Sequence, residues 1–278
     1  MLRKATGYEL RKPPASRRGR GGRVAGDLTA DRLVVAPAFV MSTVRSGSTL
    51  LRLLLDSHSQ IHSPHELHLR DLDVTVRTKY AVKALSEVRL DREQLRFLLW
   101  DRLLERELAA AGKRVLVNKT PNDVFIADEI ARCWPDARFI YLLRHPGAIA
   151  RSRQETRPQD SADRNAEMVL RYGNALELAK ANHPGLVVRY EDLTADPRTQ
   201  TQRICQFLGV PWEEGMLDYG RYDHGRMKPG LGDWKAKIKS GEVQAAEPAP
   251  ALEEIHPSLH DLCAAWGYAP AAAAQPAT

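Results

Sequence analysis

Arginine, glycine and hydroxyl residues at positions 45–49 carry the clearest chemical signal in the sequence. Arg45 supplies a fixed cation and a planar fork of N–H donors, which suits a phosphate group. Gly47 lets the backbone approach an anion closely, and Ser46, Ser48 and Thr49 add hydroxyl donors. The same residues could instead cap a helix and bind nothing. Two interpretations therefore stand side by side, an anion-binding loop and a plain helix start.

The elements on either side of these residues favour the anion-binding loop. Residues 33–41 form an apolar run that is too short for a membrane span and typical of a buried strand. The leucine-rich residues 50–55 predict a buried helix. A strand, a small-residue turn and a helix together aim backbone N–H groups at an anion. The turn is not a Walker A loop, because Ser48 follows Gly47 where that loop needs a lysine.

Two further predicted strands end in basic residues. Residues 115–118 form an apolar strand followed by Lys119, and residues 138–143 form another followed by Arg144. Pro146 then suits the first turn of a helix, and Ser152 lies within that helix. Ligands of open α/β sheets bind at the carboxyl ends of the strands. We therefore expect the basic residues to meet a ligand charge at one edge of the sheet, although a solvent-facing lysine is the alternative at position 119.

A group of histidines follows the first helix, but its pattern does not predict a metal site. Pro64 argues against a continuous helix that would align the rings, and no cysteine stands nearby. We therefore expect no bound metal. Glu66 lies within the group, and on its own it could be a surface carboxylate that pairs with Arg70. The histidines are His58, His62, His65 and His68.

The segment from Arg45 to Leu51, which reads RSGSTLL, resembles the 5′-phosphosulfate loop of sulfotransferases. These enzymes use 3′-phosphoadenosine-5′-phosphosulfate as donor and release adenosine 3′,5′-bisphosphate. An arginine replaces the lysine of the cytosolic type, so the chain is most similar to the branch with tyrosylprotein and many bacterial sulfotransferases. The resemblance covers about residues 35–268. It implies a P-loop-like α/β fold and no metal.

The resemblance also implies roles for particular residues. Residues 46–50, which are Ser46, Gly47, Ser48, Thr49 and Leu50, would hold the 5′-phosphate of the donor. Arg45 and Lys119 would stabilise the charge that builds on the transferring group. Glu66, twenty-one positions after the loop arginine, would be the general base that takes the acceptor proton. Arg144 and Ser152 would grip the 3′-phosphate and so exclude ATP.

Two nucleotide contacts depend on the last part of the resemblance. Tyr190 would lie beside the nucleotide, although it could equally be a core tyrosine with a satisfied hydroxyl. Lys228 would contact the 3′-phosphate from a loop at residues 228–235, with Arg226 able to substitute. The match is partial there, because Met227 and Pro229 stand where arginine and glycine are usual in that loop.

Strands that alternate with helices predict an α/β fold, with a mainly parallel central sheet and helices on both faces. We expect one sulfotransferase domain at residues 33–268, a basic tail at 1–32 and a flexible tail at 269–278. Capping signals at Asp91 and Gly112 predict a helix between them. Other predicted elements are helices at about 70–90, 124–133, 163–181 and 252–266, and a strand at 186–190.

Charge and cysteine usage exclude several classes of protein. The net charge is +6, but nine of the 41 basic residues and three of the 35 acidic residues lie in residues 1–32. Residues 33–278 therefore hold 32 of each and carry no gross bias toward nucleic acid. Three scattered cysteines and the lack of a membrane span or secretory signal favour a cytoplasmic protein with reduced thiols.

The sequence thus predicts a sulfotransferase that transfers a sulfuryl group to an acceptor hydroxyl on a small molecule, carbohydrate, lipid or peptide. The first alternative is an atypical ATP-dependent small-molecule kinase, which the absent Walker lysine disfavours. The second is a non-enzymatic nucleic-acid-binding protein that uses the basic tail. The sequence does not identify the acceptor, the role of the tail or the oligomeric state, which includes a homodimer among its alternatives.

Overall fold

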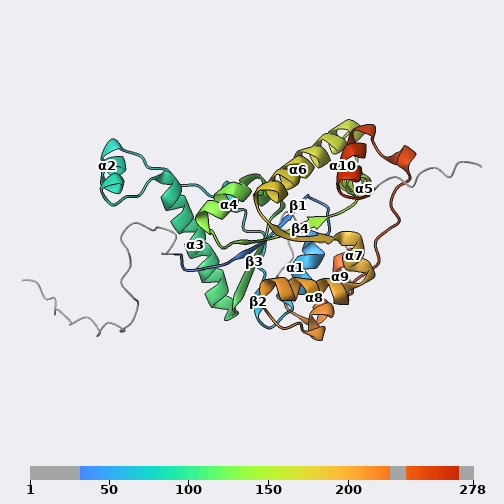
Figure 1. The fold of residues 1–278 in the computed structure, drawn as a ribbon, viewed down its shortest axis with the longest axis horizontal. Helices are drawn as coiled ribbons and strands as arrows, with labels where there is room; N and C mark the ends of the chain where they lie inside the picture. The colour runs from blue at the N-terminus through green and yellow to red at the C-terminus, as the bar shows by residue number, and fades with distance from the viewer. Residues whose placement is uncertain (1–31, 226–235, 269–278) are drawn as a thin grey trace, which may run out of the picture. The chain divides into compact units, whose positions relative to one another are not determined.

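Parallel strands form the centre of the computed structural model, which describes residues 32–225 and 236–268. The sheet has five strands in the order β2, β3, β1, β4, β5. All of its pairings are parallel, and β1 lies in the middle between two strands from later in the chain. The strands are β1 (Ala38–Ser42), β2 (Ile61–His62), β3 (Val115–Lys119), β4 (Arg138–Leu143) and β5 (Gly185–Arg189) (Figure 1). This sheet confirms the predicted α/β class.

The central strands are buried on both faces, as their continuous apolar sequence predicts. Every residue of β1 and of β3 is buried. Along β1, Phe39 and Met41 belong to one hydrophobic cluster, whereas Ala38 and Val40 belong to the other. Successive side chains of a strand point to opposite faces, so these two clusters are the two sides of the sheet.

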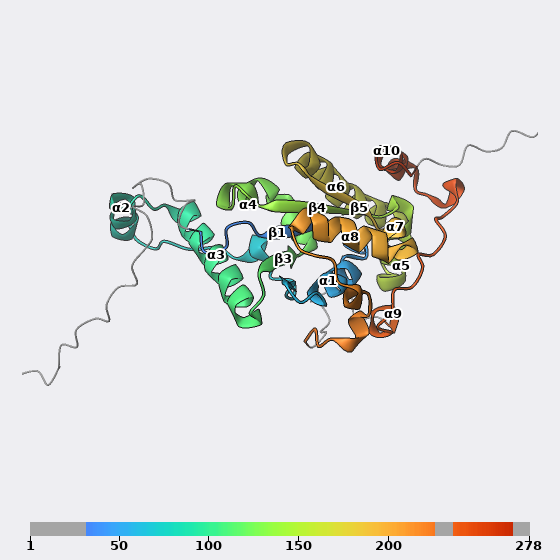
Figure 2. The ribbon, with the colours of Figure 1, turned by 60° about the horizontal axis from the view of Figure 1, so that its bottom comes forward.

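Helices cover both faces of the sheet, which confirms the predicted layers. The cluster with Phe39 contains side chains of α3, α4, α6 and α10, and the cluster with Val40 contains those of α1, α7 and α8. Figures 1 and 2 show α4 and α6 on one side of the strands and α1 on the other. The helices are α1 (Ser48–Asp56), α3 (Arg92–Ala111), α4 (Ala127–Cys133), α6 (Ala162–Asn182), α7 (Tyr190–Ala195), α8 (Pro197–Leu208) and α10 (His260–Ala265).

The predicted capping signals of α3 are confirmed. Oδ1 of Asp91 accepts the backbone N–H of Gln94 at 2.8 Å, and Gly112 ends the helix at a φ of 64°.

Within the described residues, no helix has both the length and the apolar character needed to cross a membrane. The remaining elements are α2 (Lys79–Glu87), α5 (Pro146–Thr156), α9 (Ala236–Lys239) and 3-10 turns at Leu69–Asp71, Pro121–Ile126, Glu214–Leu217, Tyr219–Arg221, Leu252–Glu254 and Pro257–Leu259.

Several expectations about element boundaries are wrong. The predicted strand at 33–41 begins only at Ala38, and the predicted helix at 124–133 begins only at Ala127. Only Lys79–Glu87 of the predicted helix at 70–90 is α-helical, and none of its side chains is buried. The predicted strand at 186–190 ends at Arg189, and Tyr190 begins α7 instead. The predicted helix at 252–266 is broken into two 3-10 turns before α10. Pro257 explains that break, because proline lacks an N–H and restricts the residue before it.

Candidate active site

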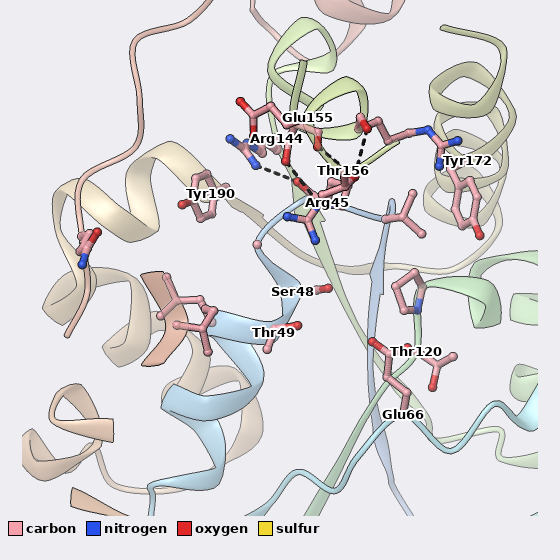
Figure 3. A pocket seen from close by; sticks show the side chains of 18 of the residues that line it. Arg45, Ser48, Thr49, Glu66, Thr120, Arg144, Glu155, Thr156, Tyr172 and Tyr190 are labelled. Atoms are coloured by element: carbon pink, nitrogen blue, oxygen red, sulfur yellow. Dashed lines mark hydrogen bonds between the residues drawn. The ribbon is translucent and has the colours of Figure 1, made fainter. Parts of the chain in front are cut away.

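A pocket of about 1290 Å³ lies at the carboxyl ends of β1, β3, β4 and β5. Figure 3 shows Arg45 and Arg144 at one end of it, Glu66 and Thr120 at the other, and the start of α1 between them. The sequence-predicted residues that line the pocket are Arg45, Gly47, Ser48, Thr49, Leu50, Glu66, Arg144, Ser152 and Tyr190. The strand order thus gathers residues from four separate junctions, as expected for an α/β sheet.

The turn between β1 and α1 has the geometry of an anion site. Gly47 stands just before the helix at a φ of 86°, and Ser48 begins the helix. Ser48 and Thr49 face the pocket (Figure 3). The hydroxyl of Ser46 points elsewhere, because it is fully buried and donates to the backbone oxygen of Thr43 at 2.8 Å. The first turn of α1 therefore offers N–H groups and two hydroxyls to the pocket.

Arg45 links the two predicted phosphate-binding segments. Its Nε donates to Oγ of Ser152 at 3.3 Å, and Nη1 of Arg144 donates to the backbone oxygen of Arg45 at 2.8 Å. The backbone of Arg45 has a φ of 65°, in the left-handed region that is unusual for a non-glycine residue. Such a conformation costs about 1–2 kcal/mol and persists only where neighbours fix it. Here the Arg144 bond to its carbonyl is one such restraint.

Tyr190 packs tightly against this turn. A Cβ atom at Gly47 would lie 2.2 Å from Cδ2 of Tyr190, so a larger residue there cannot fit without moving the ring. The guanidinium of Arg144 stands 4.7 Å from the centre of the same ring, which is a cation–π contact. Tyr190 therefore joins the wall of the pocket and fixes Arg144, and its position is that of a pocket residue rather than of a core tyrosine alone.

Glu66 and Lys119 meet at the opposite end of the pocket. Nζ of Lys119 forms an ion pair with Oε1 of Glu66. The lysine side chain is only 1% exposed and does not itself line the pocket, whereas Glu66 does. The lysine thus lies behind the carboxylate, so Glu66 covers the ammonium that the sequence assigned to the transferring group.

A buried carboxyl group stands beside this pair. The pKa of Asp123 is raised to about 7, mainly by burial and to a smaller extent by the charges of Glu66 and Asp71. Hydrogen bonds from the Asn118 amide at 2.8 Å and the Arg70 N–H at 3.5 Å act in the opposite direction but do not offset burial. Asp123 therefore connects the segment that carries Glu66 with the end of β3.

The four histidines after α1 diverge rather than converge. His58 is fully buried against the backbone oxygen of Pro211, and His62 lies beside Asp56 at 3.3 Å. His68 alone of the four lines the pocket. Among the residues that the structure describes, no group of three or more His, Cys, Asp or Glu could hold a metal ion.

Sequence reasoning missed part of the pocket wall. The sequence predicts a helix at about 163–181 but no pocket residue on it, yet Tyr172 lines the pocket and hydrogen-bonds to Oδ1 of Asn122. Asn122 could have been predicted as a pocket residue, because it lies three residues after Lys119, just past the end of the same strand. Lys228 and its substitute Arg226 lie outside the described residues. Other unpredicted lining residues are Val44, His68, Thr120, Pro121, Arg153, Glu155, Thr156, Arg157, Tyr219, Ile238, Lys239, Glu242, Gln244 and Glu247.

Comparison with solved structures supports the fold. A sulfotransferase domain from the curacin biosynthetic pathway is similar with a TM-score of 0.61 and 23% identity, over 85% of this chain and 99% of that one. The sulfotransferase domain of the Synechococcus PCC 7002 olefin synthase has a TM-score of 0.57 and 26% identity, over 84% and 96%. Both are sulfotransferase domains whose backbone follows that of this chain over nearly their full length.

Sequence relatives agree with the structural ones. The nodulation protein NoeE of Sinorhizobium fredii is 32% identical over 206 residues, or 62% of this chain and 49% of NoeE. Protein-tyrosine sulfotransferase 2 of Gallus gallus is 25% identical over 198 residues, or 65% and 53%. The chain thus spans about half the length of these curated relatives. A family model described as the sulfotransferase family matches residues 37–214, and the chain belongs to that family.

Proposed function

We propose that this protein transfers a sulfuryl group from 3′-phosphoadenosine-5′-phosphosulfate to an acceptor hydroxyl. One observation carries the proposal: Arg45 bonds to Ser152 and is bonded by Arg144, so two phosphate-type sites meet in a single pocket. A donor with phosphate at both its 3′ and 5′ positions matches two such sites. Family membership supports the reaction class.

The proposal divides the pocket into two named sides. The donor side holds the nucleotide, with its 5′-phosphate at the start of α1 and its 3′-phosphate at Arg144 and Ser152. The acceptor side places the reacting hydroxyl near Glu66. Donor-side residues are Arg45, Gly47, Ser48, Thr49, Leu50, Arg144, Ser152 and Tyr190. Acceptor-side residues are Glu66, His68, Thr120, Pro121, Asn122 and Tyr172.

Catalysis in this arrangement depends mainly on position and charge. Sulfuryl transfer resembles phosphoryl transfer, in which a loose in-line transition state leaves the protein little covalent chemistry to do. Glu66 takes the acceptor proton while Arg45 stabilises charge on the leaving phosphate. Lys119 is paired with Glu66 in the free protein and has further N–H donors for the sulfuryl oxygens, because an ammonium group carries three.

The acceptor is proposed only as a hydroxyl compound. The protein-tyrosine sulfotransferases are named for a tyrosine acceptor, whereas the name of NoeE gives none. The acceptor side mixes the aromatic ring of Tyr172 with polar groups such as Asn122 and Thr120, which suits a hydroxyl on a ring or chain. The three cysteines are buried free thiols, which supports a reducing cytoplasmic setting.

Calorimetric titration tests the donor directly. Adenosine 3′,5′-bisphosphate, ADP and ATP would each be titrated into the protein with and without Mg²⁺. We expect the bisphosphate to bind most tightly and independently of the metal. Arg144→Ala should weaken it by about 10- to 100-fold, since a charge-assisted hydrogen bond contributes about 1.5–3 kcal/mol. ADP binding should weaken clearly less, only through the Arg45 turn that Arg144 restrains.

A matched arginine controls for general loss of charge. Arg164 is exposed on α6, pairs only loosely with Asp160 at 3.6 Å and does not line the pocket. Arg164→Ala should therefore leave bisphosphate binding unchanged. Preference for ATP with Mg²⁺ would replace the proposal with a kinase. Equal losses for the bisphosphate and ADP in Arg144→Ala would remove Arg144 from the 3′-phosphate site.

A further inference from the structure

The imidazole of His68 lies in the pocket beside two carboxylates. Its Nε2 is 3.6 Å from Oε2 of Glu66, and its Nδ1 is 3.8 Å from Oδ2 of Asp71. The side chain lines the pocket and is one-third exposed. An imidazole with a carboxylate near each nitrogen can accept a proton at one nitrogen and release another from the second. This placement suits proton transfer between the pocket and its surroundings.

The backbone at His68 is held in an unusual conformation. Its φ is 49° and its ψ is 49°, in the left-handed region that costs a non-glycine residue about 1–2 kcal/mol. Its N–H donates to Oγ1 of Thr120 at 3.3 Å, which ties this turn to the end of β3. Strained residues of this kind gather at functional sites, where the surrounding structure keeps them in place. The turn sets the ring of His68 beside Glu66.

A general base inside a pocket must lose its proton before the next turnover. Lys119, Glu66, His68 and Asp71 form a line of ionisable side chains. The exposed fraction of the side chain rises along this line, from 1% at Lys119 to 11% at Glu66, 33% at His68 and 63% at Asp71. Glu66 itself faces a buried ammonium on one side. Along these side chains, the path from Glu66 to solvent therefore passes through the imidazole of His68.

We propose that His68 relays the acceptor proton from Glu66 to solvent, an inference that rests on the proposed function. As the acceptor oxygen bonds to sulfur, the bond from sulfur to the bridging oxygen breaks and its electron pair stays on the 5′-phosphate. The acceptor proton moves to Oε2 of Glu66 and then to Nε2 of His68. The ring releases its other proton from Nδ1 to water beside Asp71, and exchange with water restores the starting tautomer.

Charges from several elements act on this relay. Glu66 and Asp71 flank the ring from its own segment. From β3, Lys119 pairs with Glu66, and from the turn after β3, Asp123 is close enough for both carboxylates to affect its pKa. Loss of the ring should therefore change the pH dependence of turnover while the donor side stays intact.

Two variants separate the ring from the backbone. Asparagine tolerates the left-handed conformation, so His68→Asn removes the proton carrier without forcing the turn. His68→Gly keeps that conformation unstrained and opens a space that free imidazole can enter. His62→Asn is the matched control. His62 also lies beside two carboxylates, Asp56 at 3.3 Å and Glu107 at 3.8 Å, but it does not line the pocket.

The measurement is release of adenosine 3′,5′-bisphosphate from the sulfated donor with phenol as acceptor, from about pH 5 to about pH 9. We expect kcat to fall about 10- to 100-fold in His68→Asn, with an altered pH profile and an unchanged bisphosphate Kd. Added imidazole should restore turnover in His68→Gly. With 4-nitrophenol, which ionises near neutral pH, the loss should disappear because no proton needs to be moved.

Each other outcome counts against a stated part of the inference. If both His68 variants keep the wild-type pH profile and do not respond to imidazole, the relay is wrong. The same holds if His62→Asn loses as much activity as His68→Asn. The proposed function survives these results provided that Glu66→Gln has lost turnover. Full turnover in Glu66→Gln overturns the proposed base and the relay together.

Discussion

The donor side and the acceptor side of the pocket are built from different kinds of backbone. The donor side stands on junctions where a strand ends and a helix begins, namely β1 to α1, β4 to α5 and β5 to α7. The acceptor side stands mainly on the irregular residues 63–68 and on the turns Leu69–Asp71 and Pro121–Ile126, and α6 adds Tyr172. Backbone hydrogen bonds of the regular elements fix the first side, whereas the second needs partners from elsewhere.

Those partners are visible around the segment that carries Glu66. Nη1 of Arg52 donates to the backbone oxygen of Ser63 at 3.0 Å, and the N–H of His68 donates to Thr120. Each bond crosses between elements rather than within one. The comparison teaches that the donor side combines the ends of regular elements with tertiary restraints from Arg144 and Tyr190, while the position of the base depends on tertiary contacts alone. The two sides should therefore respond differently to substitution.

The largest expected effect on turnover comes from Glu66, which also neutralises the buried ammonium of Lys119. Glu66→Gln removes the proposed base and keeps the shape of the side chain, so kcat should fall about 10²- to 10⁴-fold. The donor side does not contain Glu66, so the bisphosphate Kd should change little. Steady-state turnover and calorimetry on the same preparation check both statements. Full activity in this variant would remove Glu66 as the base.

On the donor side, the largest effect should come from a substitution that strains the backbone. Gly47→Ala places a Cβ at a φ of 86° and 2.2 Å from the ring of Tyr190. Left-handed strain of about 1–2 kcal/mol adds to the displaced ring, so we expect a loss of about 2–4 kcal/mol of unfolding free energy. Bisphosphate binding should be lost with it, because the ring also holds Arg144. Urea unfolding and calorimetry measure the two effects.

Gly112→Ala isolates the strain from the clash. Gly112 has a φ of 64° at the end of α3, and a Cβ there would meet nothing within 4 Å. This substitution should cost only about 1–2 kcal/mol and leave nucleotide binding unchanged. If the two alanine variants lose equal stability, contact with Tyr190 is not what requires glycine at position 47.

The same difference explains what the sequence could predict. Arg45 and Arg144 each follow an apolar strand closely, so their pattern alone places them at one edge of a parallel sheet, and the structure brings them together. The parallel order and the two helical layers are confirmed for the same reason. Periodicity records which faces are buried, and burial on both faces is a property of a parallel sheet.

The residues of the acceptor side follow no such pattern in the sequence. His68 contacts Thr120 across 52 positions, and Tyr172 contacts Asn122 across 50. Contacts between residues so far apart in the sequence are not encoded in local periodicity, so the helical pattern at 163–181 does not reveal that Tyr172 lines the pocket. The wrong boundary at residues 70–90 has a related cause. The side chains of α2 are not buried, so helix length there is set by local preference and not by a core face.

Asp123 should make the folding stability depend on pH. Its pKa of about 7 lies above the unfolded value of about 3.9, so the folded state holds the extra proton between these limits. Its contribution is therefore fully present below about pH 4 and is lost as pH rises through about 7. Asp123→Asn stays neutral, so it should gain roughly 1–3 kcal/mol relative to the wild-type protein between about pH 5 and about pH 8. Urea unfolding at both pH values gives this difference.

The pKa of Asp56, a partly buried carboxylate, is shifted in the opposite direction. Burial alone would raise the pKa of Asp56, but hydrogen bonds from His224, His62 and the Ser63 N–H hold it below its usual range. The contribution of Asp56 is present above the unfolded pKa of about 3.9 and is lost as pH falls. Asp56→Asn should therefore be destabilised at neutral pH, with no gain toward pH 8 from the carboxyl itself. A similar pH slope in both variants would contradict the assigned shifts.

The smallest effects should come from two helix caps that follow the acceptor-side segment. Asp91 accepts an N–H at the start of α3, whose Phe97 and Trp100 are buried, and Thr78 does the same for α2, which has no buried side chain. Figure 1 shows α2 apart from the sheet and the other labelled helices. Asp91→Ala should cost about 1 kcal/mol of global stability.

Thr78→Ala should cost nearly nothing globally, because α2 can open without disturbing the core. Amide hydrogen exchange separates the cases, since Thr78→Ala should speed exchange only in residues 79–87. A global loss as large as that of Asp91→Ala would mean that α2 is coupled to the core through contacts beyond its own side chains.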